Sequence, residues 1–402
     1  MPATGFRFLI LNLGHFYTHL FMLLHPTVVL ALEKEFAGSY GTLLLPSTAA
    51  FAAFGAGTLP AGWLGDRMRR ETLLAIFFIG LGAGAGLAAA ATGTVMLTAG
   101  LALLGLAASI YHPVGIAMVV EGRASVGRAL GINGVWGNMG VAAAPLVAGG
   151  LSAAIGWRAA FAVPAAVAVA TGLVYLAVLM REPGTARAAP SSARQKAPEP
   201  LSGTALWRLV AALAIAAFCG GLIFHGTTVV LPKLFEERLG GVVGGLAGVG
   251  GLASLVLALA AFTQIGVGTL IDRKPIRPVL VAIALAQIPL LLAVGLADGL
   301  VVAVASLAMM AAVFGELPIH DALVARHAAP AWRARLYSVT YVLSLGVSAL
   351  AVPLVAELYE RGGFPVMFAV FAVFAALVVI AALILPRPAP ARIAAGHRRG
   401  AA

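Results

Sequence analysis

Six histidines interrupt the long apolar segments of this sequence, and they are the residues there best suited to chemistry: His15, His19, His25, His112, His225 and His320. Ionisable side chains are costly inside a membrane, so each of them is a candidate for function. A histidine ionises near neutral pH, which suits it to carry protons, and its imidazole ring is also a common metal ligand. A hydrogen bond between helices explains any single one, but it is a poor explanation for all six.

Two of these histidines, His15 and His19, lie one helical turn apart near the N-terminus. They share one sector of a helix, and a polar sector of this kind should face protein or water rather than lipid. The same sector holds Asn12, Thr18, Met22 and His25. His112 precedes Pro113, and a proline inside a helix frees a backbone carbonyl and permits a kink. These positions predict a polar site built by the first half of the chain.

The second half supplies the carboxyl groups that lie deepest in an apolar segment. Glu316 and His320 are one turn apart, and Asp321 follows directly. Arg326 marks the nearby end of the segment, so a solvated or ion-paired role for Asp321 is expected as much as a coupling role. Glu316 lies deeper, and we expect it to load and release a proton as access to the site alternates.

Together the two groups predict one pathway for substrate and protons. The histidines of the first half are expected to bind substrate or relay protons, across a cavity from Glu316. The predicted lining consists of His15, His19, His25, His112, His225, Gln264, Glu316, His320 and Asp321.

The composition requires that these residues be carried by membrane helices. Hydrophobic residues make up 61% of the chain and charged residues 10%, against about a quarter in soluble domains, and the mean hydropathy is +1.01. Breaks in the apolar pattern divide the chain into twelve segments near the length that crosses a bilayer. Without a barrel pattern, segments in lipid must be helices. They lie roughly at 6–32, 42–64, 72–91, 94–119, 127–153, 158–180, 205–232, 244–271, 277–297, 299–325, 333–357 and 363–386.

An internal repeat groups the segments into two halves. The stretch Gly-Trp-Leu-Gly-Asp-Arg from Gly62 recurs as Gly-Thr-Leu-Ile-Asp-Arg from Gly268, and Arg128 aligns with Arg335. Repeats of this kind build transporters whose substrate site lies where the repeats meet. We therefore expect an all-α membrane protein of two pseudo-symmetric six-helix bundles, residues 1–180 and 204–386. A polar, proline-rich linker at 181–203 and a basic, disordered tail at 387–402 are both expected in the cytoplasm.

The net charge of +11 follows the same plan. Of 26 Lys and Arg residues, only Lys34, Arg158, Lys233, Arg238 and Arg361 fall on one side of the twelve-helix arrangement. Positive charge concentrates on the cytoplasmic side of membrane proteins, which places both termini there. Scattered charges in short loops do not make a nucleic-acid surface. We expect a monomer in the cytoplasmic (inner) membrane of a bacterium, with a small-molecule substrate, protons and the lipid bilayer as partners and no cofactor.

The repeated charged loop is the first motif with a family resemblance. Asp66 can accept hydrogen bonds from an arginine fork or a helix N-terminus, and the small residues beside it let another helix approach. The loop resembles the Gly-x-x-x-Asp-Arg-x-Gly-Arg-Arg signature of the major facilitator superfamily. That resemblance implies the twelve-helix fold and a charge latch that favours the outward-open state. The latch residues are Gly62, Gly65, Asp66, Arg67 and Arg70, with Asp272 and Arg273 in the second copy.

The sequence departs from this signature at several positions. Arg69 stands where the signature has a glycine, and Glu71 stands where it has a basic residue. Pro275 and Ile276 interrupt the second copy, so the latch is expected to be weaker on that side.

The fifth segment resembles the Gly-x-x-x-Gly-Pro-x-x-Gly-Gly motif of antiporters in that superfamily, which implies export. The residues concerned are Gly134, Gly137, Gly140, Pro145 and Gly149. Ala144 replaces the glycine before the proline, and the closing glycine pair is offset by one residue. Close helix packing alone also explains such a glycine-rich segment.

Two shorter stretches resemble the fosmidomycin-resistance branch of proton-driven drug exporters. They are Gly-His-Phe from Gly14 and Ser-Ile-Tyr-His-Pro from Ser109. That branch carries acids where this sequence has His19 and Val114, so its coupling site and substrate do not transfer. The repeat places Asp321 opposite Val114.

These observations predict a proton-coupled secondary active transporter that exports a small organic molecule by alternating access. The alternative is a transporter of a transition metal or its chelate, with the intramembrane histidines as ligands. No nucleotide-binding loop and no His-Glu-x-x-His motif occurs in the sequence, so we expect neither an ATPase nor an enzyme.

The topology predicts where a reporter will be found. A fusion inserted at Gly203, between the two halves, should be active only as a cytoplasmic reporter, because the linker shares a side with both termini. Alkaline phosphatase and green fluorescent protein fusions read the two sides separately. Phosphatase activity at Gly203 would contradict the twelve-helix arrangement.

Overall fold

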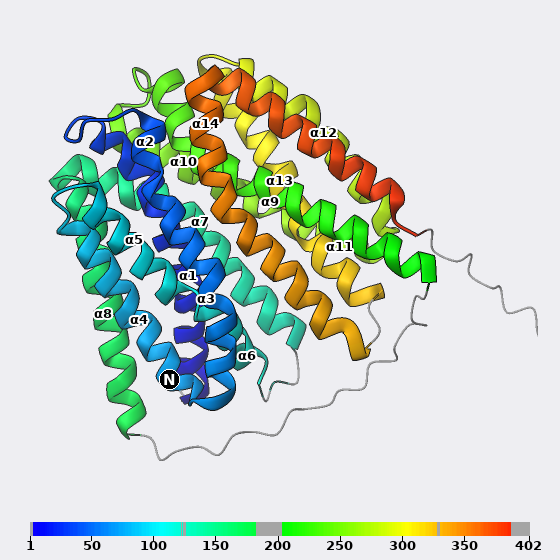
Figure 1. Ribbon diagram of the computed structural model, residues 1–402, viewed down its shortest axis with the longest axis horizontal. Helices are drawn as coiled ribbons and strands as arrows, with labels where there is room; N and C mark the ends of the chain where they lie inside the picture. Colours follow the sequence, from blue (N-terminus) through cyan, green and yellow to red (C-terminus); the bar gives the residue numbers. More distant parts are fainter. Residues whose placement is uncertain (1–2, 122, 124–125, 182–202, 328–329, 387–402) are drawn as a thin grey trace, which may run out of the picture.

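The computed structural model describes residues 3–121, 123, 126–181, 203–327 and 330–386, without the side chains of residues 3–4, 126–127, 321 and 325–345 (Figure 1). The described residues are almost entirely helical and contain no strand. The chain forms an all-α membrane protein, as its sequence predicts. Eleven described helices are long and apolar enough to cross a membrane.

The first half contains six long transmembrane passages. Its elements are α1 (Ala3–Leu32), α2 (Tyr40–Leu44), α3 (Pro46–Arg67), α4 (Arg70–Ala89), α5 (Thr94–Ala108), η1 (Tyr111–Gly115), α6 (Ile116–Val120), α7 (Val126–Ile155) and α8 (Trp157–Arg181). The short element η1 is a π-helical turn between α5 and α6, and it contains Pro113. Because proline has no N–H to donate, the α-helical ladder cannot continue through it unchanged. The regular α-helical pattern is therefore interrupted at this proline.

The second half repeats this plan. Its elements are α9 (Gly203–Leu239), α10 (Gly245–Ala261), α11 (Thr263–Arg273), α12 (Ile276–Leu296), α13 (Leu300–His327) and α14 (Pro330–Ile384). Helix α14 is interrupted at Gly363, where φ is 62° and ψ is −161°, a backbone conformation that suits glycine. It therefore consists of two helices, which is consistent with twelve crossings.

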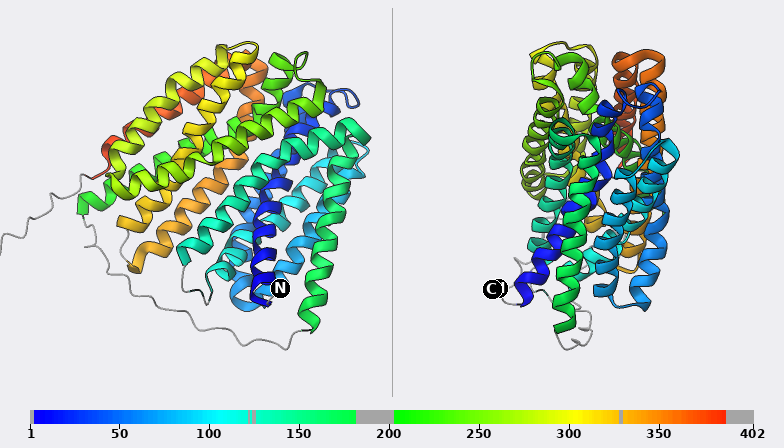
Figure 2. Two further views of the ribbon diagram at one scale, coloured as in Figure 1. Left: turned by 180° about the vertical axis from the view of Figure 1, so that it is seen from behind. Right: turned by 90° about the vertical axis from the view of Figure 1, so that its left-hand side faces the viewer.

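The two halves form bundles whose axes are inclined to each other (Figures 1 and 2). The bundles converge at the end of the molecule where α1 and α9 finish, which we call the distal end. We call the opposite end, where α1 and α9 begin, the terminal end. At the terminal end, the Arg208 side chain donates to the carbonyl of Ile384 over 3.0 Å, so the start of α9 and the finish of α14 lie together.

Glycines allow the closest helix contacts. A methyl group at Gly105 of α5 would lie 2.0 Å from the Ala50 carbonyl oxygen of α3, so no larger residue fits there. Between the halves, a methyl group at Gly250 of α10 would lie 2.2 Å from the Pro145 carbonyl oxygen of α7. Small residues take this role in lipid because van der Waals contact between backbones replaces the hydrophobic driving force.

At the distal end, the segment between α1 and α2 is tied to α8. Glu35 accepts hydrogen bonds from Trp157 Nε1 over 2.6 Å and from Arg158 over 2.9 Å. These hydrogen bonds lower the pKa of the Glu35 carboxyl. The carboxylate therefore keeps its charge, and the tie, at neutral pH.

Candidate functional site

Three histidines meet inside the first half. His15 and His19 come from α1 and His112 from η1, and one ring nitrogen from each lies within 4.8 Å of the others. The Nε2 atoms of His15 and His19 are 3.3 Å apart. The rings of His112 and His15 lie edge to face, with centroids 5.3 Å apart. We call these three residues the histidine cluster.

A hydrogen-bond network fixes the orientation of His15, which is buried. Its Nδ1 lies 2.7 Å from the backbone oxygen of Asn133 on α7, and a carbonyl only accepts, so Nδ1 carries the proton. The Asn133 side chain donates to Asn12 Oδ1 over 3.0 Å and to the Tyr111 hydroxyl over 2.8 Å. Tyr111 also stacks on the His15 ring, with centroids 5.1 Å apart. His15 Nε2 is thereby left as a lone-pair acceptor that faces His19.

The glycines of the fifth-segment motif make room for this arrangement. A methyl group at Gly137 would lie 2.7 Å from the His15 ring, and one at Gly140 would lie 2.2 Å from the Phe16 carbonyl oxygen. Gly149 lets α7 approach Leu246 of α10 in the other half. At Gly134, a methyl group would have no atom of another described residue within 4 Å. Most of the motif therefore serves close packing of α7 against α1 and α10.

In the second half, Glu316 of α13 is 3% exposed and has two side-chain partners. Its Oε2 accepts a hydrogen bond of 2.7 Å from Gln287 Nε2 of α12. Its Oε1 lies 3.2 Å from His320 Nε2, one turn along the same helix. Gly220 of α9 packs directly against this oxygen: a methyl group at Gly220 would lie only 2.6 Å from Glu316 Oε1.

A small cavity connects Glu316 with another predicted histidine. It has a volume of about 30 Å³, enough for one water molecule, and lies between α9 and α13. Its lining includes Phe224, His225, Glu316 and His320. His225 also packs edge to face against Phe51 of α3, with ring centroids 5.8 Å apart, so it lies where the halves meet.

The remaining predicted site residues lie apart from these two groups. His25 is buried farther along α1, about 15 Å from His15 by helix rise, and its Nδ1 lies 2.6 Å from the Ser47 hydroxyl. Gln264 is the second residue of α11 and follows Thr263, whose hydroxyl donates to the Ala311 carbonyl of α13 over 2.8 Å. The side chain of Asp321 lies outside the described residues.

The predicted latch residues lie at the terminal end. Asp66 is exposed and has no ion pair among the described residues. The Arg67 guanidinium stacks on Trp63 of its own helix at 3.9 Å, and Arg70 pairs with Glu121 at 3.5 Å. A methyl group at Gly65 would lie 3.1 Å from Val114, and one at Gly62 would lie 3.5 Å from Pro113. Both glycines therefore pack against η1.

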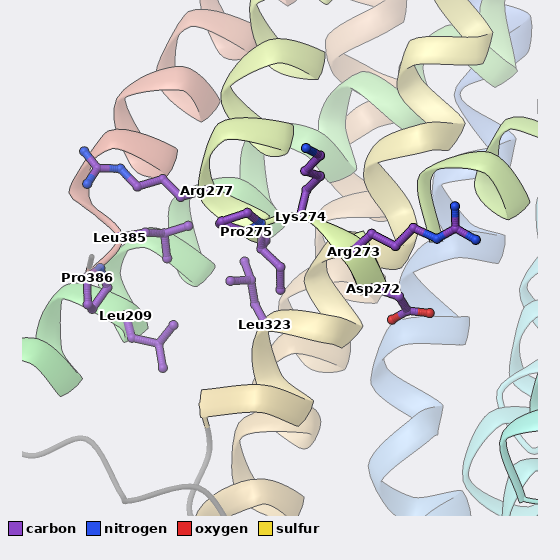
Figure 3. Close-up of a pocket in the computed structure, with 10 residues that line it drawn as sticks. Leu209, Asp272, Arg273, Lys274, Pro275, Arg277, Leu323, Leu385 and Pro386 are labelled. Carbon is purple, nitrogen blue, oxygen red and sulfur yellow. The ribbon is translucent and has the colours of Figure 1, made fainter. Parts of the chain in front are cut away.

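The second copy of the latch borders a pocket of about 340 Å³ on the terminal end of the second half (Figure 3). Leu209, Leu323 and Leu385 gather around Pro275, whereas the Arg273 and Arg277 guanidinium groups point away on opposite sides. Asp272 also lines the pocket. The lining includes neither Glu316 nor the histidine cluster, so the pocket is separate from the site.

At the distal end, a buried lysine joins the two halves. Lys233 of α9 is 6% exposed, and its Nζ lies 3.0 Å from Glu33 at the end of α1 and 3.1 Å from Glu236. It also lies 3.5 Å from Glu237 and 5.3 Å from the Tyr40 ring of α2. Glu33 and Tyr40 belong to the first half, so the ammonium group bridges both bundles.

Further contacts close the same end. The Gly41 N–H of α2 donates to Glu360 of α14 over 2.9 Å, and the Tyr40 and Tyr359 rings meet edge to face at 5.1 Å. The Leu146 N–H of α7 donates to the Ser254 hydroxyl of α10 over 2.9 Å. We call these contacts, with those of Lys233, the distal gate. These contacts join the two halves at the distal end, whereas Asp66 is exposed at the terminal end. The structure is therefore closed at its distal end.

Sequence reasoning missed three residues of this arrangement. Gln287 is the single amide of α12, and Asn133 is one of two amides, with Asn138, in the otherwise apolar middle of α7; amides inside apolar helices are the signal that would have found both. In the sequence, Lys233 stands out only as one of the few positive charges on its side of the membrane. Its partner Glu33 lies 200 residues away, so their contact leaves no local pattern in the sequence.

The chain is similar to known transporters in sequence and in structure. The family profile of the Major Facilitator Superfamily matches residues 11–351. No curated protein sequence matches. A bacterial homologue of the human lysosomal transporter Spinster, in an inward-facing and occupied conformation, is similar with a TM-score of 0.75 and 16% identity over 96% of both chains.

Two further solved structures share this fold. A peptide transporter POT in complex with sulfate has a TM-score of 0.71 and 16% identity, covering 94% of this chain and 93% of its own. A D-xylose-proton symporter has a TM-score of 0.71 and 15% identity, covering 94% of this chain and 96% of its own. At these identities the likeness shows the fold.

The distal gate predicts the effect of removing its cation. Lys233→Met leaves Glu33, Glu236 and Glu237 facing one another without a positive charge. This should weaken closure by about 1 to 2 kcal/mol, or about tenfold in the ratio of closed to open molecules. Spin labels at Ala37 and Val242, in a background without Cys219, should then report longer distances across the distal end.

Lys34→Met is the matched control, because Lys34 is an exposed lysine close to Glu33. That variant should leave the distance distribution as in the parent protein. Equal distributions for Lys233→Met and Lys34→Met would show that Lys233 does not hold the halves together.

Proposed function

The chain belongs to the major facilitator superfamily, whose profile covers residues 11–351, and from this we propose that it is a proton-coupled exporter of a small organic molecule. Membership establishes a multi-pass secondary transporter rather than an enzyme, acting on a small-molecule substrate. The coupling ion, the direction and the sites below are the parts that we propose.

The proposed orientation places the terminal end in the cytoplasm. The distribution of Lys and Arg supports it, since 21 of the 26 fall on that side of the twelve-helix arrangement. Residues 1–180 and 204–386 are then two bundles of a monomer in a bacterial inner membrane. The linker 181–203, the tail 387–402 and both termini are cytoplasmic. In this orientation the closed distal gate leaves the protein facing the cytoplasm.

One observation carries proton coupling: Glu316 is a buried carboxyl held by Gln287 and His320 beside a cavity the size of one water molecule. A carboxyl in such a place changes its charge only when a proton reaches it. His225 lines the same cavity and lies between the halves, so a rocking motion would expose this cavity to one side and then to the other.

The first half is proposed to hold the substrate. Its histidine cluster offers ring nitrogens next to the aromatic faces of Tyr111 and Phe54, whose centroid lies 5.8 Å from that of His112. Aromatic faces and a few convergent polar groups suit a small organic ligand. Gly137 supports this site because it leaves space for the His15 ring.

Export is supported by the two resemblances in the first half. The fifth-segment motif resembles that of antiporters, and the stretches around His15 and His112 resemble the fosmidomycin-resistance branch. In export by proton antiport, a proton enters from outside as the substrate leaves.

The runner-up is transport of a transition metal or its chelate. The observation in its favour is the convergence of His15, His19 and His112. The same vesicle assay separates the two functions, since a metal cargo would accumulate without any organic substrate.

The coupling proposal is tested by Glu316→Gln. A thermal-shift screen of drugs, metabolites, metals and chelates on the purified protein first supplies a transported compound. In vesicles the variant should lose accumulation driven by a pH gradient, because glutamine cannot take up the proton. Exchange of labelled for unlabelled compound should persist, because exchange needs no net proton movement.

Glu357→Gln is the control, because this exposed carboxyl pairs only with Arg361 among the described residues. Undiminished gradient-driven transport by Glu316→Gln would move coupling to Asp321 or the histidines. Undiminished transport by Asp321→Asn as well would remove both carboxyls from the mechanism.

The latch proposal concerns the outward-facing state. Asp66 is exposed when the terminal end is open, and we expect it to accept from an arginine or a helix N-terminus when that end closes. Asp66→Asn should reduce transport several-fold without lowering expression. Wild-type transport rates in this variant would exclude a latch at Asp66.

A further inference from the structure

We propose that the histidine cluster is a binding site for one divalent transition-metal ion, with His15, His19 and His112 as its three ligands. This inference does not rest on the transport function, because metal binding is an equilibrium property that is measured without transport. It also assigns metal binding to three of the six intramembrane histidines.

The distance between the first two ligand atoms fits a metal. A tetrahedral zinc ion holds imidazole nitrogens at about 2.0 to 2.1 Å, which places two such nitrogens about 3.3 to 3.4 Å apart. The Nε2 atoms of His15 and His19 are 3.3 Å apart. Their spacing on one face of α1, one helical turn, makes this approach possible.

The tautomer of His15 also suits metal binding. Metal-bound histidines usually donate their second ring N–H to a carbonyl or carboxylate, which turns the other nitrogen toward the metal. His15 Nδ1 donates to the Asn133 carbonyl over 2.7 Å, so Nε2 carries the lone pair on the side of His19. Tyr111 stacks on the ring, and Gly137 leaves room for it. The first ligand is therefore oriented before an ion arrives.

The third ligand comes from a different element. A ring nitrogen of His112 lies within 4.8 Å of the other two ligand atoms, and His112 is carried by the π-helical turn η1. Such turns occur often at functional sites because they displace one residue from the regular helix face. To bind the same ion, this nitrogen has to approach the other two from within 4.8 Å to about 3.3 Å, the separation of two ligands of one tetrahedral ion.

The ligand set determines the class of ion. Three neutral imidazoles suit zinc, copper, nickel and cobalt, and they disfavour magnesium and calcium, which prefer oxygen ligands. Three protein ligands leave a fourth position open, as in zinc sites that exchange a bound group. In this protein the open position would accept water or a donor atom of a chelating molecule.

Equilibrium binding tests the site directly. The protein is purified with a histidine-free tag, stripped with a chelator and titrated with Zn²⁺ and Co²⁺ in detergent. We expect one ion per chain, with Co²⁺ absorption bands typical of tetrahedral nitrogen coordination. His19→Gln and His112→Gln should each weaken binding at least about tenfold.

His25→Gln is the matched control, because His25 lies on the same helix and its ring is paired with Ser47 outside the cluster. It should bind the ion as the parent protein does, and so should Glu316→Gln, which separates this site from proton coupling. Thermal unfolding without metal shows whether each variant is folded. Absence of stoichiometric binding in the parent protein would overturn the proposal, and so would affinity equal to that of the parent protein in both His19→Gln and His112→Gln.

Discussion

A polar group inside the membrane has to find its partner within the protein, because lipid offers none. Three of the buried polar side chains described above have such partners. His15 Nδ1 donates to the Asn133 carbonyl, Glu316 Oε2 accepts from Gln287, and Lys233 pairs with three carboxylates. The partners Asn133, Gln287 and Glu33 join α1 with α7, α12 with α13, and the end of α1 with α9. The same contacts that make burial of the polar groups tolerable therefore hold the bundles in register.

The pairings also separate two tasks. Those of His15 and Glu316 stay within one half, so each half carries its own polar site as a rigid unit. The pairing of Lys233 with Glu33 crosses between the halves, and it can break when they move. A transporter that rocks two bundles needs both kinds of contact: permanent ones inside the bundles and reversible ones at the two ends of the pathway.

The sequence predicts the fold well and the site in part. Hydrophobic segment length and the repeated Asp-Arg loop predict twelve helices in two halves, because these signals are local or periodic. The approach of His15 to His19 follows from helix geometry. The contacts of Glu316 with Gln287, and of Lys233 with Glu33, depend on which helices pack together, and no local pattern encodes that. His25 shares the helix sector of His15 but lies too far along α1 to join the cluster.

The central claim is that the two ends of the pathway open reciprocally, and one distance tests it. Spin labels at Met68 and Lys274 lie at the terminal ends of the two halves. If opening of the distal gate and closure of the terminal end are one motion, Lys233→Met should shorten this distance in a substantial fraction of molecules. An unchanged Met68–Lys274 distance in Lys233→Met molecules whose distal end has opened would contradict alternating access by rocking of the two bundles.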